Sequence, residues 1–378
     1  APTEILAKQH FDKISRFLSG MSSGLGKVNC VLLTGAMKPA ARSAAVEEVR
    51  SGVAQLVVGT HALLSADVAF RDLGLMIIDE QHKFGVKQRA ALSGKGGTAD
   101  ILIMTATPIP RTLAITLYGD LDISVLKEMP PGRREVKTLC LKSSRKEDLY
   151  ALIEEHVRQG RQAFIVYPLV EESAETDILS AKSMYDELTG NVFPSFRIGL
   201  VHGKMKTAQQ AKVMEDFCSN KLDVLVSTTI LEVGIDVPNA TVMAVENAER
   251  FGLAQLHQLR GRVGRGVHPS VCVLISDAAS EDALARLAAM ERYSDGFRIA
   301  EEDLKIRGPG EFFGSRQHGL SQLKIADPLA QMQLLRAARS EALRITSADP
   351  SLSGAENREV KEEMVRRFPE YEKAMLTG

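Results

Sequence analysis

The sequence predicts an α/β protein with two doubly wound parallel-sheet lobes in tandem and a small C-terminal helical domain. Two observations lead to this fold class. Short apolar runs alternate with helical patterns in two successive stretches, which is typical of parallel sheets covered by helices on both faces. Beyond about residue 278 the apolar runs stop and only helical patterns remain.

The first lobe is expected over residues 1–129. Residues 2–7 read as the tip of an earlier strand and its turn. The predicted strands are 30–33, 55–58, 75–78 and 101–104, and Thr, Gly or Asp follows each run. Pro130-Pro131-Gly132 then interrupts the pattern and predicts a linker.

The second lobe is expected over residues 133–278, with strands at 163–167, 198–202, 224–227, 242–245 and 271–275. Residues 279–378 form the third part. Here we expect helices at 283–293 and 297–306, a glycine-rich loop at 307–314, and further helices near 328–346 and 355–375.

Composition limits the protein class. The 378 residues suffice for two or three domains, and 44% hydrophobic with 25% charged residues is typical of a soluble globular protein. No stretch is apolar enough to span a membrane. The net charge of −1 means that any nucleic-acid contact must come from a local basic face. The cysteines match no metal or redox spacing, which favours buried reduced thiols in a cytoplasmic protein; they are Cys30, Cys140, Cys218 and Cys272.

An acidic pair directly follows the predicted strand 75–78. In a nucleotide hydrolase, the first acid, here Asp79, holds Mg²⁺ through water, and the second, here Glu80, orients the attacking water. An equally open interpretation is a solvated acidic pair at a strand end.

Hydroxyl residues follow two other predicted strands. Thr105 and Thr107 would lie beside the acids and could hydrogen-bond to them; the alternative is an ordinary turn with Thr107 as a helix N-cap before Pro108. In the second lobe, Thr229 ends a strand and leads to Gly234 and Asp236. Short hydroxyl residues and backbone amides at a strand tip suit phosphate contacts.

An arginine pair in the second lobe gives the more specific signal. Gln258, Gly261, Arg262, Gly264 and Arg265 fit the pattern Q-x-x-G-R-x-G-R. Arginines supplied from a second lobe can stabilise the charge on a transferring phosphoryl group. A solvated basic helix end is the alternative, and the glycines disfavour it because a helix surface does not need them.

A phosphate-binding loop is missing from the sequence. The glycine runs at 24–27 and 94–97 have neither the spacing nor the strand-to-helix context of G-x-x-x-x-G-K-[ST]. The chain begins with Ala1, without a signal peptide, and reads like the middle of a domain. We therefore expect a piece of a longer protein with its phosphate loop upstream, and predict that these residues alone bind ATP weakly and do not hydrolyse it.

The motifs together resemble superfamily 2 helicases. The resemblance rests on Asp79-Glu80-Gln81-His82, on residues 105–112 (TATPIPRT) and on residues 255–265 (QLHQLRGRVGR). With residues 303–311 (DLKIRGPGE) and 314–317 (GSRQ), the chain is similar more narrowly to the RecG family, whose members migrate branched DNA at stalled forks and Holliday junctions. The resemblance spans nearly the whole chain and implies RecA-like lobes, ATP and Mg²⁺ as cofactors, branched duplex DNA as partner, no membrane association, and a monomer.

The resemblance also implies residue roles. Asp79 and Glu80 would serve Mg²⁺ and water, and Arg262 and Arg265 would be the arginine fingers. Coupling of ATP to DNA would fall to Thr105, Thr107, Gln258, Gly234 and Asp236. DNA contact and translocation would fall to Pro2, Thr3, Thr229, Arg286, Arg307 and Gln317.

Three alternatives remain at this stage. A transcription-repair coupling translocase shares the second lobe, but its acid box usually has Glu where this chain has Gln81. A DEAD-type RNA helicase fits less well, because the box reads DEQH and the next motif reads Thr-Ala-Thr. A silent DNA-binding module predicts degenerate acids and arginines, and both are intact here.

Overall fold

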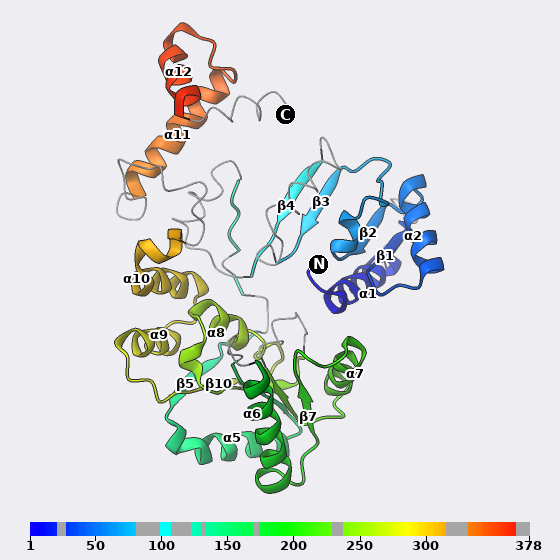
Figure 1. The fold of residues 1–378 in the computed structure, drawn as a ribbon, viewed down its shortest axis with the longest axis vertical. Helices are drawn as coiled ribbons and strands as arrows, with labels where there is room; N and C mark the ends of the chain where they lie inside the picture. Colours follow the sequence, from blue (N-terminus) through cyan, green and yellow to red (C-terminus); the bar gives the residue numbers. More distant parts are fainter. Residues whose placement is uncertain are drawn as a thin grey trace. The chain divides into compact units, whose positions relative to one another are not determined.

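A computed structural model describes residues 1–20, 28–80, 99–106, 122–126, 128–129, 133–168, 174–228, 237–314 and 332–367 (Figure 1). The chain divides into two compact units. Residues 1–108 and 128–306 form the first, and residues 109–127 and 307–378 form the second. Among the described residues, none of the helices combines the length and the apolar character that a bilayer crossing needs.

Two parallel strand pairs form the N-terminal part of the first unit. Strands β1 (Cys30–Leu33) and β2 (Leu56–Gly59) pair in parallel, as do β3 (Leu75–Ile78) and β4 (Asp100–Ile103). Helix α1 (Glu4–Gly20) lies against β1 and β2, and α2 (Pro39–Ser51) lies against β1, while a 3-10 helix, η1, spans His61–Leu64. All four strands predicted here are confirmed to within one residue.

A six-stranded parallel sheet forms the second part of that unit, in the order β5-β10-β9-β6-β8-β7. The strands are β5 (Lys137–Leu141), β6 (Gln162–Val166), β7 (Ile198–Val201), β8 (Val224–Ser227), β9 (Ala240–Val245) and β10 (Val271–Ile275). The five strands predicted for this lobe are confirmed. The sequence interpretation missed β5, the edge strand beside β10.

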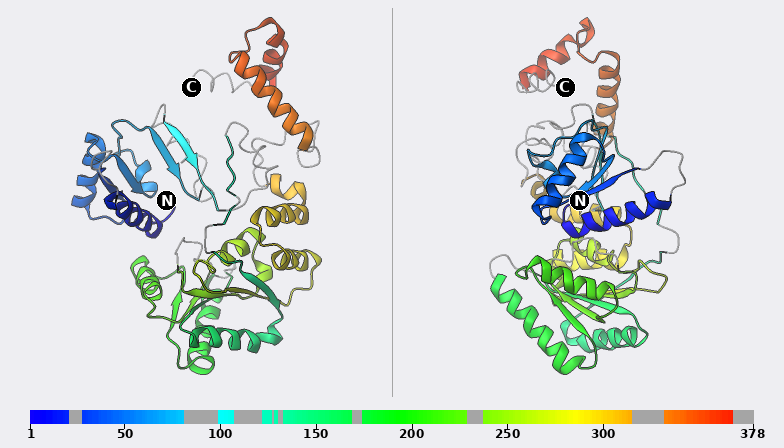
Figure 2. Two further views of the ribbon diagram at one scale, coloured as in Figure 1. Left: turned by 180° about the vertical axis from the view of Figure 1, so that it is seen from behind. Right: turned by 90° about the vertical axis from the view of Figure 1, so that its right-hand side faces the viewer.

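Helices cover both faces of this sheet (Figure 2). Helices α7 (Thr207–Cys218), α8 (Leu253–Arg260) and α9 (Glu281–Arg292) pack on one face, where Phe164 and Val166 of β6 enter the core. Helix α5 (Lys146–Arg158) and the π-helix η5 (Leu188–Val192) pack on the other face, with Ala163 and Ile165. Helix α6 (Ala174–Glu187) contacts β7 and β8. Because alternate β6 residues enter opposite cores, the doubly wound prediction is confirmed.

Helix α10 (Gly296–Gly314) corrects one expectation. The glycine-rich loop predicted at 307–314 is wrong, because the helix continues through this segment and places Arg307 within it. Proline disfavours a helix interior. The residues flanking Pro309 on both sides, however, include good helix formers such as Lys305 and Glu311, and they carry the helix through it.

The second unit contains helices α11 (Met332–Ala348) and α12 (Arg358–Arg367), with a 3-10 helix, η8 (Ala355–Asn357), before α12. They match the helices predicted near 328–346 and 355–375 where the structure describes them. Two further 3-10 helices are described in the first unit: η3 (Ser143–Arg145) precedes α5 and η7 (Ala248–Arg250) precedes α8.

The cysteines differ in exposure. Cys272 is buried, Cys30 and Cys140 are half-buried, and Cys218 is exposed. The expectation of buried thiols is therefore wrong for Cys218, because it is the last residue of α7 and does not face the sheet.

Candidate functional site

The acidic pair lies at the carboxyl edge of the β3–β4 pair. Asp79 and Glu80 directly follow β3, and Thr105 follows β4. Ile78 lies opposite Ile103, and the Met104 amide donates to the Ile78 carbonyl at 2.8 Å, so both strands end at the same edge. The structure therefore brings Thr105 to the edge that carries the acids, as predicted.

Two donors orient the Asp79 carboxylate. Oδ2 lies 3.1 Å from Nε2 of His10 on α1, and Oδ1 accepts the Glu80 amide at 3.0 Å. The hydrogen bond from His10 is the main cause that lowers the pKa of Asp79, against the opposing effect of burial. Asp79 is therefore ionised at neutral pH and can only accept, so His10 is the donor.

Glu80 has an unusual backbone conformation. Its φ is +52°, in the left-handed region that few residues other than glycine adopt. At this bend the Glu80 amide donates to Oδ1 of the preceding carboxylate. A strained residue at a strand end is a frequent feature of functional sites.

The arrangement fits Mg²⁺ held through water. A carboxylate offers about four lone-pair positions, and the donors from His10 and Glu80 leave the others to accept from water. Mg²⁺ keeps several of its waters and needs only one or two carboxylates. In the described part of the chain no group of three or more His, Cys, Asp or Glu side chains could enclose a metal.

Pro2 and Thr3 lie at the start of α1. The Thr3 side-chain oxygen accepts the Leu6 amide at 3.4 Å, and its carbonyl accepts the Ala7 amide at 3.0 Å. Thr3 is therefore the N-cap of α1. The strand tip expected for residues 2–7 is wrong from Glu4 onward, because Glu4 begins the helix.

The predicted arginine fingers follow α8. Arg262 is buried, whereas Arg265 is exposed and donates from Nε to the Gly261 carbonyl at 3.0 Å. Gly264 has a φ of +73°, and a Cβ there would lie 2.6 Å from Cγ2 of Val136. Since this turn requires glycine, the segment is a specific packed turn and not a plain helix end.

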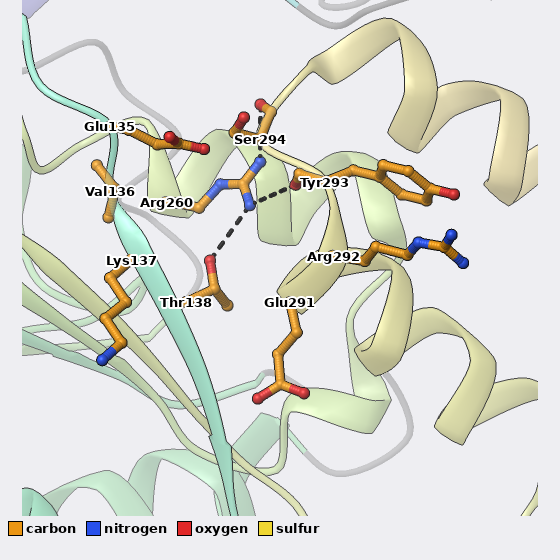
Figure 3. A pocket seen from close by; sticks show the side chains of 9 residues that line it. All are labelled: Glu135, Val136, Lys137, Thr138, Arg260, Glu291, Arg292, Tyr293 and Ser294. Atoms are coloured by element: carbon orange, nitrogen blue, oxygen red, sulfur yellow. Dashed lines mark hydrogen bonds between the residues drawn. The ribbon is translucent and has the colours of Figure 1, made fainter.

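Arg260, which the sequence interpretation left without a role, is a buried clamp (Figure 3). Nη1 donates to the carbonyls of Met290 and Tyr293 at 2.9 and 2.8 Å and to Oγ1 of Thr138 at 3.2 Å. Nη2 donates to the Ser294 carbonyl at 3.0 Å. The guanidinium thus joins the end of α8 to the end of α9 and to β5. It lines a pocket with residues 291–294 and 135–138, which is accordingly a structural junction.

Arg286 makes a second link from α9. Nη1 donates to the Phe251 carbonyl at 3.3 Å and Nη2 to the Glu249 carbonyl at 3.2 Å. These carbonyls belong to the segment that leads into α8. Arg286, predicted for translocation, is therefore tied to the helix that precedes the arginine-finger turn.

Thr228 and His202 are buried polar side chains at the carboxyl edge of the six-stranded sheet. Thr228 follows β8 and His202 follows β7, and the Thr228 amide donates to the Val201 carbonyl at 3.2 Å. Within the described residues, Thr228 Oγ1 and His202 Nδ1 have no hydrogen-bond partner. Burial, with nearby Lys182 and Lys204, lowers the pKa of His202. Buried polar atoms of this kind suit a partner from outside the chain.

Several predicted residues lie outside the described part of the chain. They are Thr107, Thr229, Gly234, Asp236 and Gln317. The predicted linker at 130–132 and the glycine runs at 24–27 and 94–97 lie outside it too. Gln258 lies in α8, one turn before the arginine-finger segment.

Three family models match successive parts of the chain. Residues 1–115 match the DEAD/DEAH box helicase family, and residues 144–267 match the helicase conserved C-terminal domain. Residues 293–374 match domain 3, C-terminal, of the ATP-dependent DNA helicase RecG.

Curated relatives give the same result. The ATP-dependent DNA helicase RecG of Thermotoga maritima is 50% identical over 91% of this chain and 44% of its own length. That of Bacillus subtilis is 43% identical over 97% of this chain and 53% of its own length. The chain thus spans about half the length of the curated relatives that it matches.

Solved structures agree with the sequence comparisons. A structure of RecG bound to a three-way DNA junction is similar with a TM-score of 0.69 and 46% identity, over 88% of this chain and 42% of that one. The S. cerevisiae protein Dbp5 bound to RNA and ADP BeF3 reaches a TM-score of 0.55 at 16% identity, over 81% of this chain and 79% of that one, a likeness of fold alone. The predicted RecA-like fold class is confirmed.

Proposed function

We propose that this chain, which belongs to the RecG family of ATP-dependent DNA helicases, forms the motor of an enzyme that uses ATP to migrate branched DNA. Stalled forks and Holliday junctions are the substrates that this activity would serve. The observation that carries the proposal is the acidic pair, because an ionised and oriented Asp79 followed by Glu80 is what nucleotide hydrolysis requires.

In this proposal Asp79 holds Mg²⁺ through water. When bound, the ion would neutralise charge on the phosphates of ATP. Glu80, whose amide donates to Asp79, would hold and orient the attacking water. Arg262 and Arg265 would bind the γ-phosphate and stabilise charge that develops on it during transfer.

Coupling between ATP and DNA would run through residues at the same edges. Thr105 follows β4 at the edge that carries the acids, and Gln258 lies in α8. Thr107, Gly234 and Asp236 would act with them. Pro2, Thr3 and Thr229 would contact the DNA backbone. The buried polar atoms of His202 and Thr228 support a phosphate contact at the carboxyl edge of the six-stranded sheet, because each can hydrogen-bond to a bound ligand.

Translocation would involve the helices after the second sheet. Arg286, Arg307 and Gln317 are the proposed residues. The clamps support this role, because Arg260 joins the end of α8, which leads into the arginine fingers, to α9, and Arg286 joins α9 to the segment before α8. A change at the fingers would therefore reach α9 through direct hydrogen bonds.

The remaining features of the proposal follow from the family. We infer a monomer that acts in the cytoplasm, without membrane association. The division into lobes at 1–129 and 133–278 and a helical part at 279–378 also remains a proposal.

Substitution of the acidic and arginine residues in the full-length protein tests this function. Glu80→Gln is expected to lower ATP hydrolysis by roughly 10²–10⁴-fold, as for loss of a general base. Arg265→Ala is expected to lower it by roughly 10³-fold, as for loss of an arginine finger. DNA binding should persist in both. Arg292→Ala, an exposed arginine on α9, is the control, and unchanged hydrolysis in Glu80→Gln and Arg265→Ala would contradict the proposal.

A further inference from the structure

We propose that His10 is a positioning residue for the acidic pair, through which α1 connects the DNA-contacting end of that helix to Asp79. The inference rests on the proposed function. It assigns His10 a role in the DNA dependence of nucleotide and Mg²⁺ binding, without direct contact to either ligand.

His10 contacts Asp79 directly. His10 Nε2 lies 3.1 Å from Asp79 Oδ2, and the two residues are 69 positions apart in the chain. The Glu80 amide, which holds the other carboxylate oxygen, belongs to the same strand end as Asp79. His10 therefore fixes this carboxylate to a different element of the lobe, helix α1.

His10 lies close to the capped start of α1. Thr3 caps the helix and His10 follows seven residues later, which is two turns, on the same side of the helix. Two turns separate these positions by ~10 Å along the axis. The end expected to meet DNA and the residue that holds Asp79 thus share one short, continuous helical segment.

That segment of α1 is rigid. Leu6 and Ala7 are buried between Thr3 and His10, and α1 lies against β1 and β2. Closely packed elements move as units with little internal deformation. A small shift of α1 on DNA engagement would therefore be carried to the His10 imidazole, and with it to the orientation of Asp79.

The contact between His10 and Asp79 is partly shielded from water. The side chains of His10 and Asp79 are 40% and 27% exposed, so the pair is only partly accessible to water. Partners that orient a metal-binding side chain typically contribute roughly 10–100-fold to metal affinity or activity. An effect of that size is measurable and exceeds what exposed substitutions produce.

The variants separate the hydrogen bond from the shape of the ring. His10→Phe keeps the ring and removes the donor, whereas His10→Gln restores a donor at similar reach. His61→Gln is the matched control, an exposed histidine in the same lobe. All variants are made in the full-length protein.

The measurement is the Mg²⁺ concentration for half-maximal binding of a fluorescent, non-hydrolysable ATP analogue, with and without branched DNA. DNA is expected to lower this concentration in the wild type and in His61→Gln. In His10→Phe we expect the half-maximal Mg²⁺ concentration to rise by roughly 10-fold and to be the same with and without DNA. His10→Gln should restore both the value and the DNA effect.

Two results would overturn the inference. One is an unchanged Mg²⁺ requirement in His10→Phe; the other is a DNA effect that persists in that variant. DNA affinity measured without nucleotide shows whether the variant folds. If His10→Phe loses it, His10→Asn, whose amide matches Nδ1 of the ring and does not replace the Nε2 donor, takes its place with the same expected result. A wild type whose hydrolysis DNA does not stimulate would instead contradict the proposed function, which keeps the two failures distinct.

Discussion

Replacement of Arg260 by alanine tests the junction between α8 and α9. The guanidinium donates to three main-chain carbonyls, of which the contact with Met290 is buried and those with Tyr293 and Ser294 are partly buried. Loss of the donor leaves the buried carbonyl unsatisfied, at about 1–3 kcal/mol, and weakens the other two, which water can reach. We therefore expect Arg260→Ala to lower the free energy of unfolding by roughly 3 kcal/mol.

Thermal unfolding followed by circular dichroism measures this effect. For a lobe of this size about 3 kcal/mol corresponds to a fall in Tm of roughly 6–12 °C. Arg292→Ala is the matched control, because that guanidinium is exposed and lies 5.3 Å from the centre of the Tyr293 ring, a contact that contributes about 0.5–1 kcal/mol. Equal shifts in the two variants would refute the assignment of Arg260 as a buried clamp.

Three further predictions concern other parts of the chain. Gly264→Ala should lower the free energy of unfolding by at least about 1–2 kcal/mol, because the φ of +73° disfavours a side chain. Gly190→Ala, where a Cβ meets open space, should not lower it, and chemical denaturation compares the two variants. The Asp349 carboxylate accepts from Asn357, Gly354 and Ser353, which holds its pKa at about 2. Its stabilisation of the turn between α11 and α12 should therefore be complete above about pH 4 and be lost as pH falls toward 2. A fall in the protection factor of the Gly354 amide, which compares its exchange with that of an unstructured peptide at the same pH, would show the loss, and an unchanged protection factor would contradict it. Chelation of Mg²⁺ with EDTA should abolish ATP hydrolysis and leave DNA binding in place, and hydrolysis that survives EDTA would argue against the water-held ion.

Local sequence patterns were sufficient for most of the sheet. Buried parallel strands are short apolar runs that end at polar residues, and among the described residues this pattern located every strand except β5. Strand β5 escaped because it is an edge strand: its residues, from Lys137 to Leu141, are at most half-buried, so polar and apolar residues mix in it. The acids and Thr105 were also predicted, because they follow adjacent strand ends.

Contacts between distant segments were not predictable in the same way. Arg260 reads as one more arginine in a basic motif, and its role depends on carbonyls 30–34 residues further along the chain. The contact of His10 with Asp79 spans 69 positions. The loop predicted at 307–314 failed for the opposite reason, because glycine and proline were given more weight than the helix formers around them. Tertiary partners, which a single sequence does not reveal, decided the roles of Arg260 and His10.

The most direct test of the proposed function is the rate of ATP hydrolysis with branched and linear DNA. The protein that carries these residues is assayed with a four-way junction or fork and with linear duplex of equal length, and Glu80→Gln gives the background. We predict much stronger stimulation by the branched DNA. Equal stimulation by linear duplex would contradict branch migration and indicate a duplex translocase, and absence of hydrolysis with either would contradict an ATP-driven motor.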